Sequence, residues 1–150
     1  MAALFAFLHH IAAFTVFAAL VVELILIREA LTVGSARRLQ IADMVYGISA
    51  GILIVVGLLR VFYFEKGAYY YFHTWTFITK LALFVIIGLV SIIPTLEFLS
   101  WRKAVKQGQA PSMSPERVRT LRSIIHWELA GIVAIILMAA LMAKGIGLLL

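Results

Sequence analysis

The segment LFAFLHHIAAFTVFAALVVELILI, from Leu4 to Ile27, carries only three ionisable side chains, His9, His10 and Glu23. A helix that crosses the hydrocarbon core of a bilayer requires about 20 predominantly apolar residues. No basic residue precedes the segment, and its apolar run is longer than the roughly 7 to 15 residues of a signal-peptide core. The segment therefore predicts a retained membrane-spanning helix.

Three further segments reach the length of a membrane span: Ala42 to Phe64, His73 to Leu96 and Ser123 to Lys144. The chain of 150 residues is 64% hydrophobic and 13% charged, with a mean hydropathy of +1.07, which leaves too few polar residues to cover a soluble globule. Short connections make sequential helices antiparallel. We therefore predict one all-α domain over residues 1–150, an integral membrane protein folded as an antiparallel up-down four-helix transmembrane bundle.

The basic residues of the connections predict the orientation of this bundle. The first connection carries Arg28, Arg37 and Arg38, whereas the second carries only Lys66. The basic residues of the third connection are Arg102, Lys103, Lys106, Arg117, Arg119 and Arg122. Because positively charged loops stay in the cytoplasm, both termini are expected outside. This bias accounts for the net charge of +6 without a nucleic acid partner, and the absence of cysteine excludes disulfides and thiolate metal sites.

The third connection, Trp101 to Arg122, contains glycine, proline and serine residues that favour an irregular loop. Ser114 followed by Pro115 is typical of a helix start, with serine as the N-cap and proline at the first helical position. We expect the helix of the fourth span to begin there, and Pro94 to kink the third span near its inner end.

Helical periodicity separates the two adjacent histidines. A turn of about 100° per residue places His9 on one stripe with alanines and Glu23, and places His10 among phenylalanines on another side. Small residues mark the faces at which membrane helices pack. We therefore expect His9 to face the bundle and His10 to face lipid. The same criterion predicts a packing stripe on the fourth span made of Trp127, Gly131, Ala134, Met138 and Leu141.

The ionisable residues of the spans fall into two layers. The outer layer is basic and contains His9, Arg60 and Lys80, with His73 at its rim. The inner layer contains Glu23, Asp43, Tyr46, Glu97, His126 and Glu128. Each such group near the bilayer centre costs about 2.5 to 3.5 kcal/mol on insertion scales, so each requires a partner or a function. One interpretation is that His9, Lys80 and Glu23 satisfy one another inside the bundle.

The alternative interpretation is a ligand site, because the outer layer holds no carboxylate within the membrane to balance Lys80 and Arg60. A b-type haem has an apolar body, carboxylate arms and an iron that binds imidazole. We expect His9 as the iron ligand, Lys80 and Arg60 near the propionates, His73 at the rim, and Met138 or Lys80 as a second axial group. In the inner layer, we expect a proton-linked role for Glu23, His126 and Glu128.

Several motifs carry a resemblance to known families. They are FAFLHHIAAF at 5–14, DMVYG at 43–47, RVFYFEKGAYYYFH at 60–73, KLALFVIIGLVSIIPT at 80–95 and MAKGIG at 142–147. At these motifs the chain resembles, nearly end to end, a family of small bacterial four-span membrane proteins of unknown function. It is more distantly similar to HemJ-type protoporphyrinogen oxidases and to the membrane part of CopD-type copper-resistance proteins.

The HemJ-type resemblance implies that a histidine early in the first span and a lysine in the third span bind b-type haem. In this sequence these two residues are His9 and Lys80. The chain departs from the HemJ pattern at the start of the fourth span, where it has His126, Trp127 and Glu128. The late arginine of the first span is displaced to Arg28. The resemblance also implies a multi-pass protein of the bacterial inner (cytoplasmic) membrane.

Three functions remain open from the sequence. The first is a haem-binding oxidoreductase that transfers electrons, with a quinone or a porphyrin as partner. The second is a non-catalytic subunit or assembly factor that packs into a homo-oligomer or a larger membrane complex through its alanine and glycine faces. The third is proton-linked or metal-linked transport, for which copper is disfavoured because the chain has no cysteine and five scattered methionines.

Overall fold

A computed structural model describes residues 1–149 of the chain. Its elements are α1 (Ala2–Leu26), α2 (Val33–Leu59), the π-helix η1 (Arg60–Phe64), α3 (Ala68–Phe72), α4 (Trp75–Ser100), α5 (Arg102–Lys106) and α6 (Pro115–Ala143). Four helices are long and apolar enough to cross a membrane: α1, α2 continued by η1, α4 continued by α5, and α6. The predicted all-α four-helix membrane bundle is confirmed.

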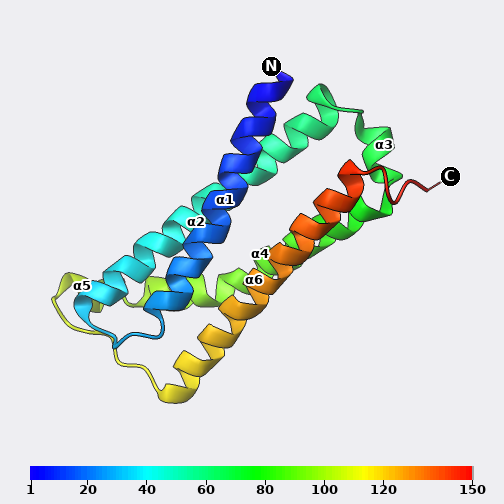
Figure 1. The fold of residues 1–150 in the computed structure, drawn as a ribbon. Helices are drawn as coiled ribbons and strands as arrows, with labels where there is room; N and C mark the ends of the chain where they lie inside the picture. The colour runs from blue at the N-terminus through cyan, green and yellow to red at the C-terminus, as the bar shows by residue number, and fades with distance from the viewer. Residues whose placement is uncertain (150) are drawn as a thin grey trace.

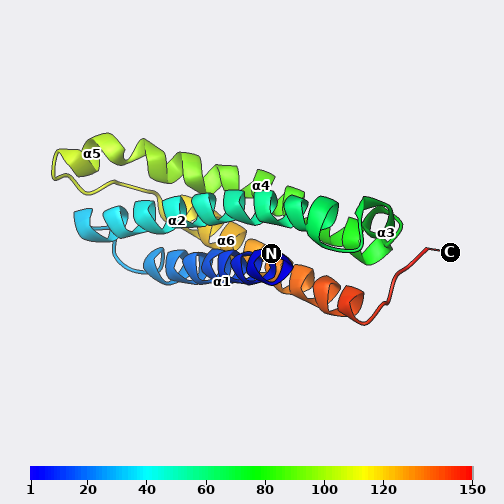
Figure 2. The ribbon, with the colours of Figure 1, turned by 90° about the horizontal axis from the view of Figure 1, so that it is seen from above.

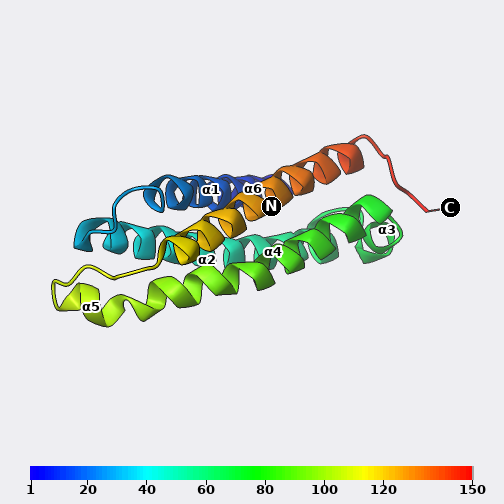
Figure 3. The ribbon, with the colours of Figure 1, turned by 90° about the horizontal axis from the view of Figure 1, so that it is seen from below.

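Figure 1 shows the course of the four long helices, each of which contacts two of the others. The most extensive contacts join α1 to α2 and α4 to α6, and smaller ones join α1 to α6 and α2 to α4. Views from above (Figure 2) and from below (Figure 3) show these helices running side by side, with α3 at one end and α5 at the other. The predicted up-down topology follows, and both termini lie at the α3 end, where Phe5 stacks on Phe64 and Leu149 donates a hydrogen bond to the carbonyl of His73.

Local signals explain where the helices begin. The side chain of Ser114 accepts a hydrogen bond from the backbone of Arg117, and Pro115 opens α6, so the predicted helix start is confirmed. Thr32 and Ser35 form a capping box that starts α2 well before the apolar segment at Ala42. The irregular part of the third connection is shorter than expected, because α5 occupies its first residues. Helix α4 runs without interruption through Pro94.

Most of the core lies in the half of the bundle near α5. The side chains there that are almost fully buried include Leu20, Ile27, Leu39, Phe98, Leu121 and Ile125. A smaller, separate cluster of Val61, Tyr71 and Phe77 closes the α3 end. The four helices are therefore held together tightly at one end, and the polar residues of the other half surround a space between them.

The predicted packing face of α6 is partly wrong. Trp127 is 74% exposed, whereas Glu128 is 1% exposed and Ile132 is also buried. Gly131 does lie at a helix contact, because a Cβ added to it would approach the side chain of Ile87 on α4 to 2.6 Å. The buried face is thus rotated away from Trp127, so that it carries a carboxyl group into the core.

Candidate functional site

A cavity of about 250 Å³ lies in the half of the bundle near α3. It is called the His9 cavity below, and its lining comes from α1, α2, η1, α3, α4 and α6. Its polar or sulfur-containing lining residues are His9, Arg60, Glu65, Tyr71, Lys80 and Met142, and the others are apolar or glycine. The structure therefore brings three predicted site residues, His9, Arg60 and Lys80, around one space.

His9 is half-buried on α1 and packs against α2 at Gly57. A Cβ at position 57 would lie 3.2 Å from Cε1 of the imidazole, so glycine leaves room for the ring. The Nδ1 atom of His9 is buried without a hydrogen-bond partner, and among residues 1–149 the ring makes no hydrogen bond at all. Unpaired polar groups in an apolar interior are costly, so this imidazole is unusual for a purely structural residue.

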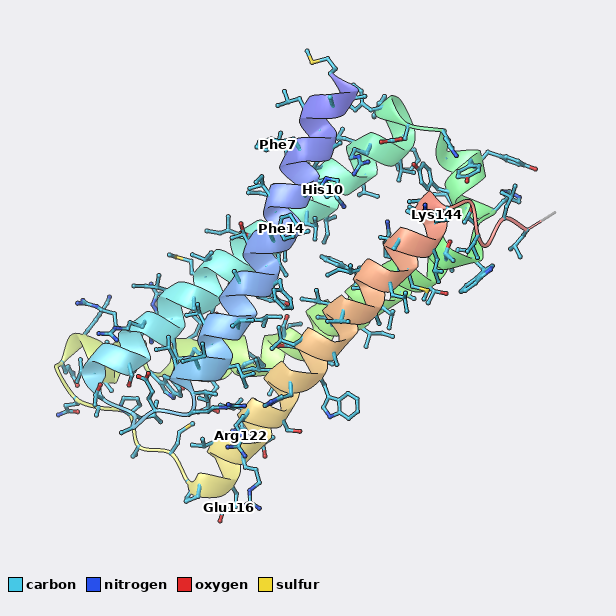
Figure 4. All side chains as sticks on the ribbon, in the orientation of Figure 1. Phe7, His10, Phe14, Glu116, Arg122 and Lys144 are labelled. Atoms are coloured by element: carbon cyan, nitrogen blue, oxygen red, sulfur yellow. The ribbon has the colours of Figure 1, made fainter. Side chains whose placement is uncertain are left out.

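His10 differs from His9 in its exposure and in its hydrogen bonding. It is exposed, and its Nδ1 lies 2.6 Å from the backbone oxygen of Ala6 in the preceding turn. Figure 4 labels it with Phe7 and Phe14 on α1, and these two side chains are 60% and 69% exposed. The predicted separation of an inward His9 from an outward His10 is confirmed.

Arg60 begins the π-helix η1. Such helices are rare in proteins, and those that occur are often found at functional sites. Its Nη2 atom donates to Oε1 of Glu65 at 2.7 Å, whereas its Nε atom is buried without a partner. The outer layer was expected to hold no carboxylate within the membrane, and the partner of Arg60 comes instead from the connection, where Glu65 reaches back to it. Beside this pair, burial raises the pKa of the Tyr71 hydroxyl, and the negative charge of Glu65 adds to the effect.

Lys80 is the cation of the His9 cavity without a carboxylate partner, because neither salt bridge in the described part of the chain involves it. It is half-buried on α4, and its Nζ lies 5.2 Å from the centre of the Phe77 ring. Arg60 is a charged neighbour of Lys80, and both cations are charged neighbours of His9. The cavity is consequently positive, with one carboxylate at its rim.

Two residues predicted for the same site lie elsewhere. His73 is exposed, stacks on Tyr69 with ring centres 4.0 Å apart, and has Nδ1 2.8 Å from the backbone oxygen of Tyr69. Met138 does not line the cavity, whereas Met142, one turn later on α6, does. The sequence reasoning missed Glu65, Tyr71 and Met142 as lining residues. Only Met142 had a signal, because it follows Met138 at helical spacing.

The inner acidic layer is divided by the fold. Glu23 and Glu128 are each 1% exposed in the core, and Asp43 on α2 is close enough to repel both of them. His126 is exposed instead, with Nε2 3.3 Å from Nη2 of Arg28. The structure therefore does not bring His126 into the core with the two glutamates, and its proton-linked role stays a prediction.

The interpretation that Glu23 satisfies His9 and Lys80 is wrong as well. Glu23 and His9 are fourteen residues apart on α1, which corresponds to about 21 Å along the helix axis. The ionisable residues of the spans thus form two distinct groups, one around the His9 cavity and one in the half of the bundle near α5.

Comparison with known proteins agrees with this architecture. No curated protein and no solved structure matches the chain, so the resemblance to HemJ-type and CopD-type proteins gains no support. A family model described as "Predicted membrane protein (DUF2214)" matches residues 1–147. The chain therefore belongs to the DUF2214 family of predicted membrane proteins.

Proposed function

We propose that the His9 cavity binds an amphipathic anionic cofactor, and that this cofactor is b-type haem with His9 as an axial ligand. The observation that carries the proposal is the imidazole of His9, which faces a glycine, makes no hydrogen bond within residues 1–149 and lies among cations. A lipid head group would also satisfy the cations, but it offers no metal centre for the imidazole nitrogen of His9. The proposal includes a location in the bacterial cytoplasmic membrane.

The residues around the cavity match the chemistry of haem in three respects. His9 offers an imidazole nitrogen, Lys80 and Arg60 offer cations for carboxylate arms, and Met142 offers a thioether, a group that also binds haem iron in some proteins. The volume of about 250 Å³ is below the roughly 300 to 1,000 Å³ of typical cofactor pockets. Part of the macrocycle would therefore lie outside the cavity, against the apolar side chains that border it.

Haem held in this way supplies one-electron transfer, and the protein would be an electron carrier or an oxidoreductase of the membrane. The residues of the chain would bind and orient it. Lys80 would attract a propionate, since no salt bridge of residues 1–149 involves it, and Gly57 would leave room for the imidazole of His9. A quinone or a porphyrin is the proposed redox partner, because both are apolar enough to approach from the bilayer.

The test is the absorption spectrum of the protein purified in detergent, as isolated and after reduction, with and without added haem. We expect the parent to show a haem-type Soret band and His9→Ala to lose it while still inserting and purifying. His10→Ala is the matched control, because it removes a neighbouring, exposed imidazole, and it should leave the spectrum nearly unchanged. Lys80→Ala should release haem more readily.

A parent protein that stays colourless with excess haem would contradict the proposal. Equal loss of the band in both histidine variants would contradict it too, because it would show that fold damage rather than ligation is measured. Either outcome would favour the second function, a non-catalytic subunit of a homo-oligomer or of a larger complex. Another protein that co-purifies with the chain would support the larger complex.

A further inference from the structure

The two glutamates of the core are unlike the other carboxylates of the chain. Glu23 on α1 and Glu128 on α6 are each 1% exposed. Oε1 of Glu23 and both carboxyl oxygens of Glu128 are buried without a hydrogen-bond partner. Glu97, by comparison, is paired with Arg117 at 2.9 Å and accepts from the indole of Trp101.

The surroundings of this carboxyl pair contain no cation. From α2, Asp43 and Tyr46 face it, and from α4, Thr95 donates to Oδ1 of Asp43 at 2.6 Å. Ser91 of α4 lies beside the hydroxyl of Tyr46. The nearest basic groups along the chain, Arg28 and His126, are exposed and bonded to each other.

Two ionised carboxylates cannot persist in such a place. Transfer of a charge into an apolar interior costs several kcal/mol even after relaxation, and like charges close together repel. A metal ion is a poor alternative, because residues 1–149 contain no group of three acidic, histidine or cysteine side chains that could hold one. The species that matches three unpaired oxygens and no cation is a proton.

We propose that Glu23 and Glu128 form an exchangeable proton-binding site in the core, reached from the α5 end of the bundle. The proton comes from water at that end, bonds to a carboxylate oxygen of the pair and leaves by the same route, with no electron transferred. This site is separate from the His9 cavity and does not depend on haem. Glu23 and Glu128 are two of the three residues predicted to be proton-linked. The neighbour of this pair in the structure is Asp43 and not His126.

The polar side chains near the pair indicate the route. Asp43 is 8% exposed and hydrogen-bonded to Thr95, and Gln40, about one turn nearer to α5, is half-buried and donates to the carbonyl of Phe98. Towards α3, Ser49 and Ser91 are the buried polar side chains of α2 and α4 nearest to the pair, and Thr76, the next one on α4, follows only beyond the buried Ile87 and Phe77. The buried residues that follow the two serines, Val56 and Ile87, are apolar. The pair is thus connected to one end of the bundle only.

The test is infrared spectroscopy of the full-length protein in lipid vesicles at neutral pH, which detects the C=O stretching band of protonated carboxyl groups. We expect the parent to show this band and to shift it after transfer to D₂O, because the proton exchanges. The double variant Glu23→Gln with Glu128→Gln should lose the band. Glu97→Gln is the matched control and should keep it, since Glu97 forms a salt bridge with Arg117.

Several outcomes would overturn the proposal. They are a parent without the band, a band that survives in the double variant, and a band that D₂O never shifts, which would mean a sealed structural contact. Loss of the band on addition of Na⁺ would identify a cation site instead. The D₂O measurement on the parent requires no variant, so an absent or unshifted band overturns the proposal even if the double variant fails to fold. His9→Ala should leave every result unchanged, which separates this test from that of haem binding.

Discussion

Tyr71 lies at the α3 end of the His9 cavity, where it packs against Phe77 and faces Glu65. It belongs to a run of three consecutive tyrosines, a cluster typical of a membrane interface, and nothing in the spacing of Tyr69, Tyr70 and Tyr71 distinguishes the three. Their exposure does, because Tyr69 is 79% exposed and Tyr71 only 8%. A single residue of the cluster therefore belongs to the cavity.

We predict that the hydroxyl of Tyr71 ionises above the ordinary tyrosine value of about 10, because burial and Glu65 raise its pKa. The folded state then holds this proton more firmly than the unfolded state. The stability that follows is complete below pH about 10 and is lost as the pH rises through the folded pKa. An ultraviolet titration of tyrosinate should lose a late-ionising group in Tyr71→Phe. Tyr69→Phe is the exposed control and should keep the late-ionising group, whose loss in that variant would refute the assignment.

At the scale of helices, the α4 and α6 pair depends on a close contact at Gly131. The glycine lets α6 approach the buried Ile87 of α4, and even a Cβ would come within 2.6 Å of its terminal methyl group. Gly47 and Gly51 of α2 have no atom within 4 Å of such a Cβ. Glycine is therefore a packing requirement at one of these positions and not at the other two.

We predict that Gly131→Val destabilises the protein by about 1 to 3 kcal/mol, the usual cost of an overpacked core. The second substitution Ile87→Ala should restore part of this loss, because it removes the atoms in conflict. Thermal unfolding in detergent, followed by circular dichroism, measures both effects. Gly47→Ala serves as the control, and it should be neutral or slightly stabilising. A neutral Gly131→Val would show that the two helices can separate at that point.

The whole molecule has its polar groups at two levels. The His9 cavity is positive and lies towards α3, whereas the carboxyl pair lies towards α5. The basic connections lie at the α5 end and the termini at the α3 end (Figure 1). If the positive-inside bias holds, the carboxyl pair exchanges protons with the cytoplasmic side and the cavity opens near the outer side.

We predict this orientation from the distribution of arginine and lysine. A reporter fused after Leu39 should be cytoplasmic and a reporter fused after Leu150 should be external, because the first connection is basic and the second has only Lys66. Enzymatic reporters that are active on only one side of the membrane make the measurement. The reverse pattern would exchange the two sides and make the carboxyl pair an externally accessible site.

Apolar length determined the four spans, the Ser114–Pro115 capping signal determined the start of α6, and helical periodicity separated His9 from His10. These properties are local, since apolar length decides membrane insertion and a fixed turn per residue decides which neighbours share a face. The meeting of His9, Arg60 and Lys80 could be predicted in outline, because antiparallel helices of known orientation place residues at calculable depths.

Only the tertiary structure decided which side chains of different helices touch. The rotation of α6 about its axis buries Glu128 and exposes Trp127 and His126. The pattern of small residues had predicted that Trp127 lies on the packing face. The π-helix and the short α3 bring Glu65 to Arg60 and bury Tyr71 beside them. Depth follows from counting residues, but helix rotation and the path of a connection result from the packing of all helices at once, which no single segment encodes.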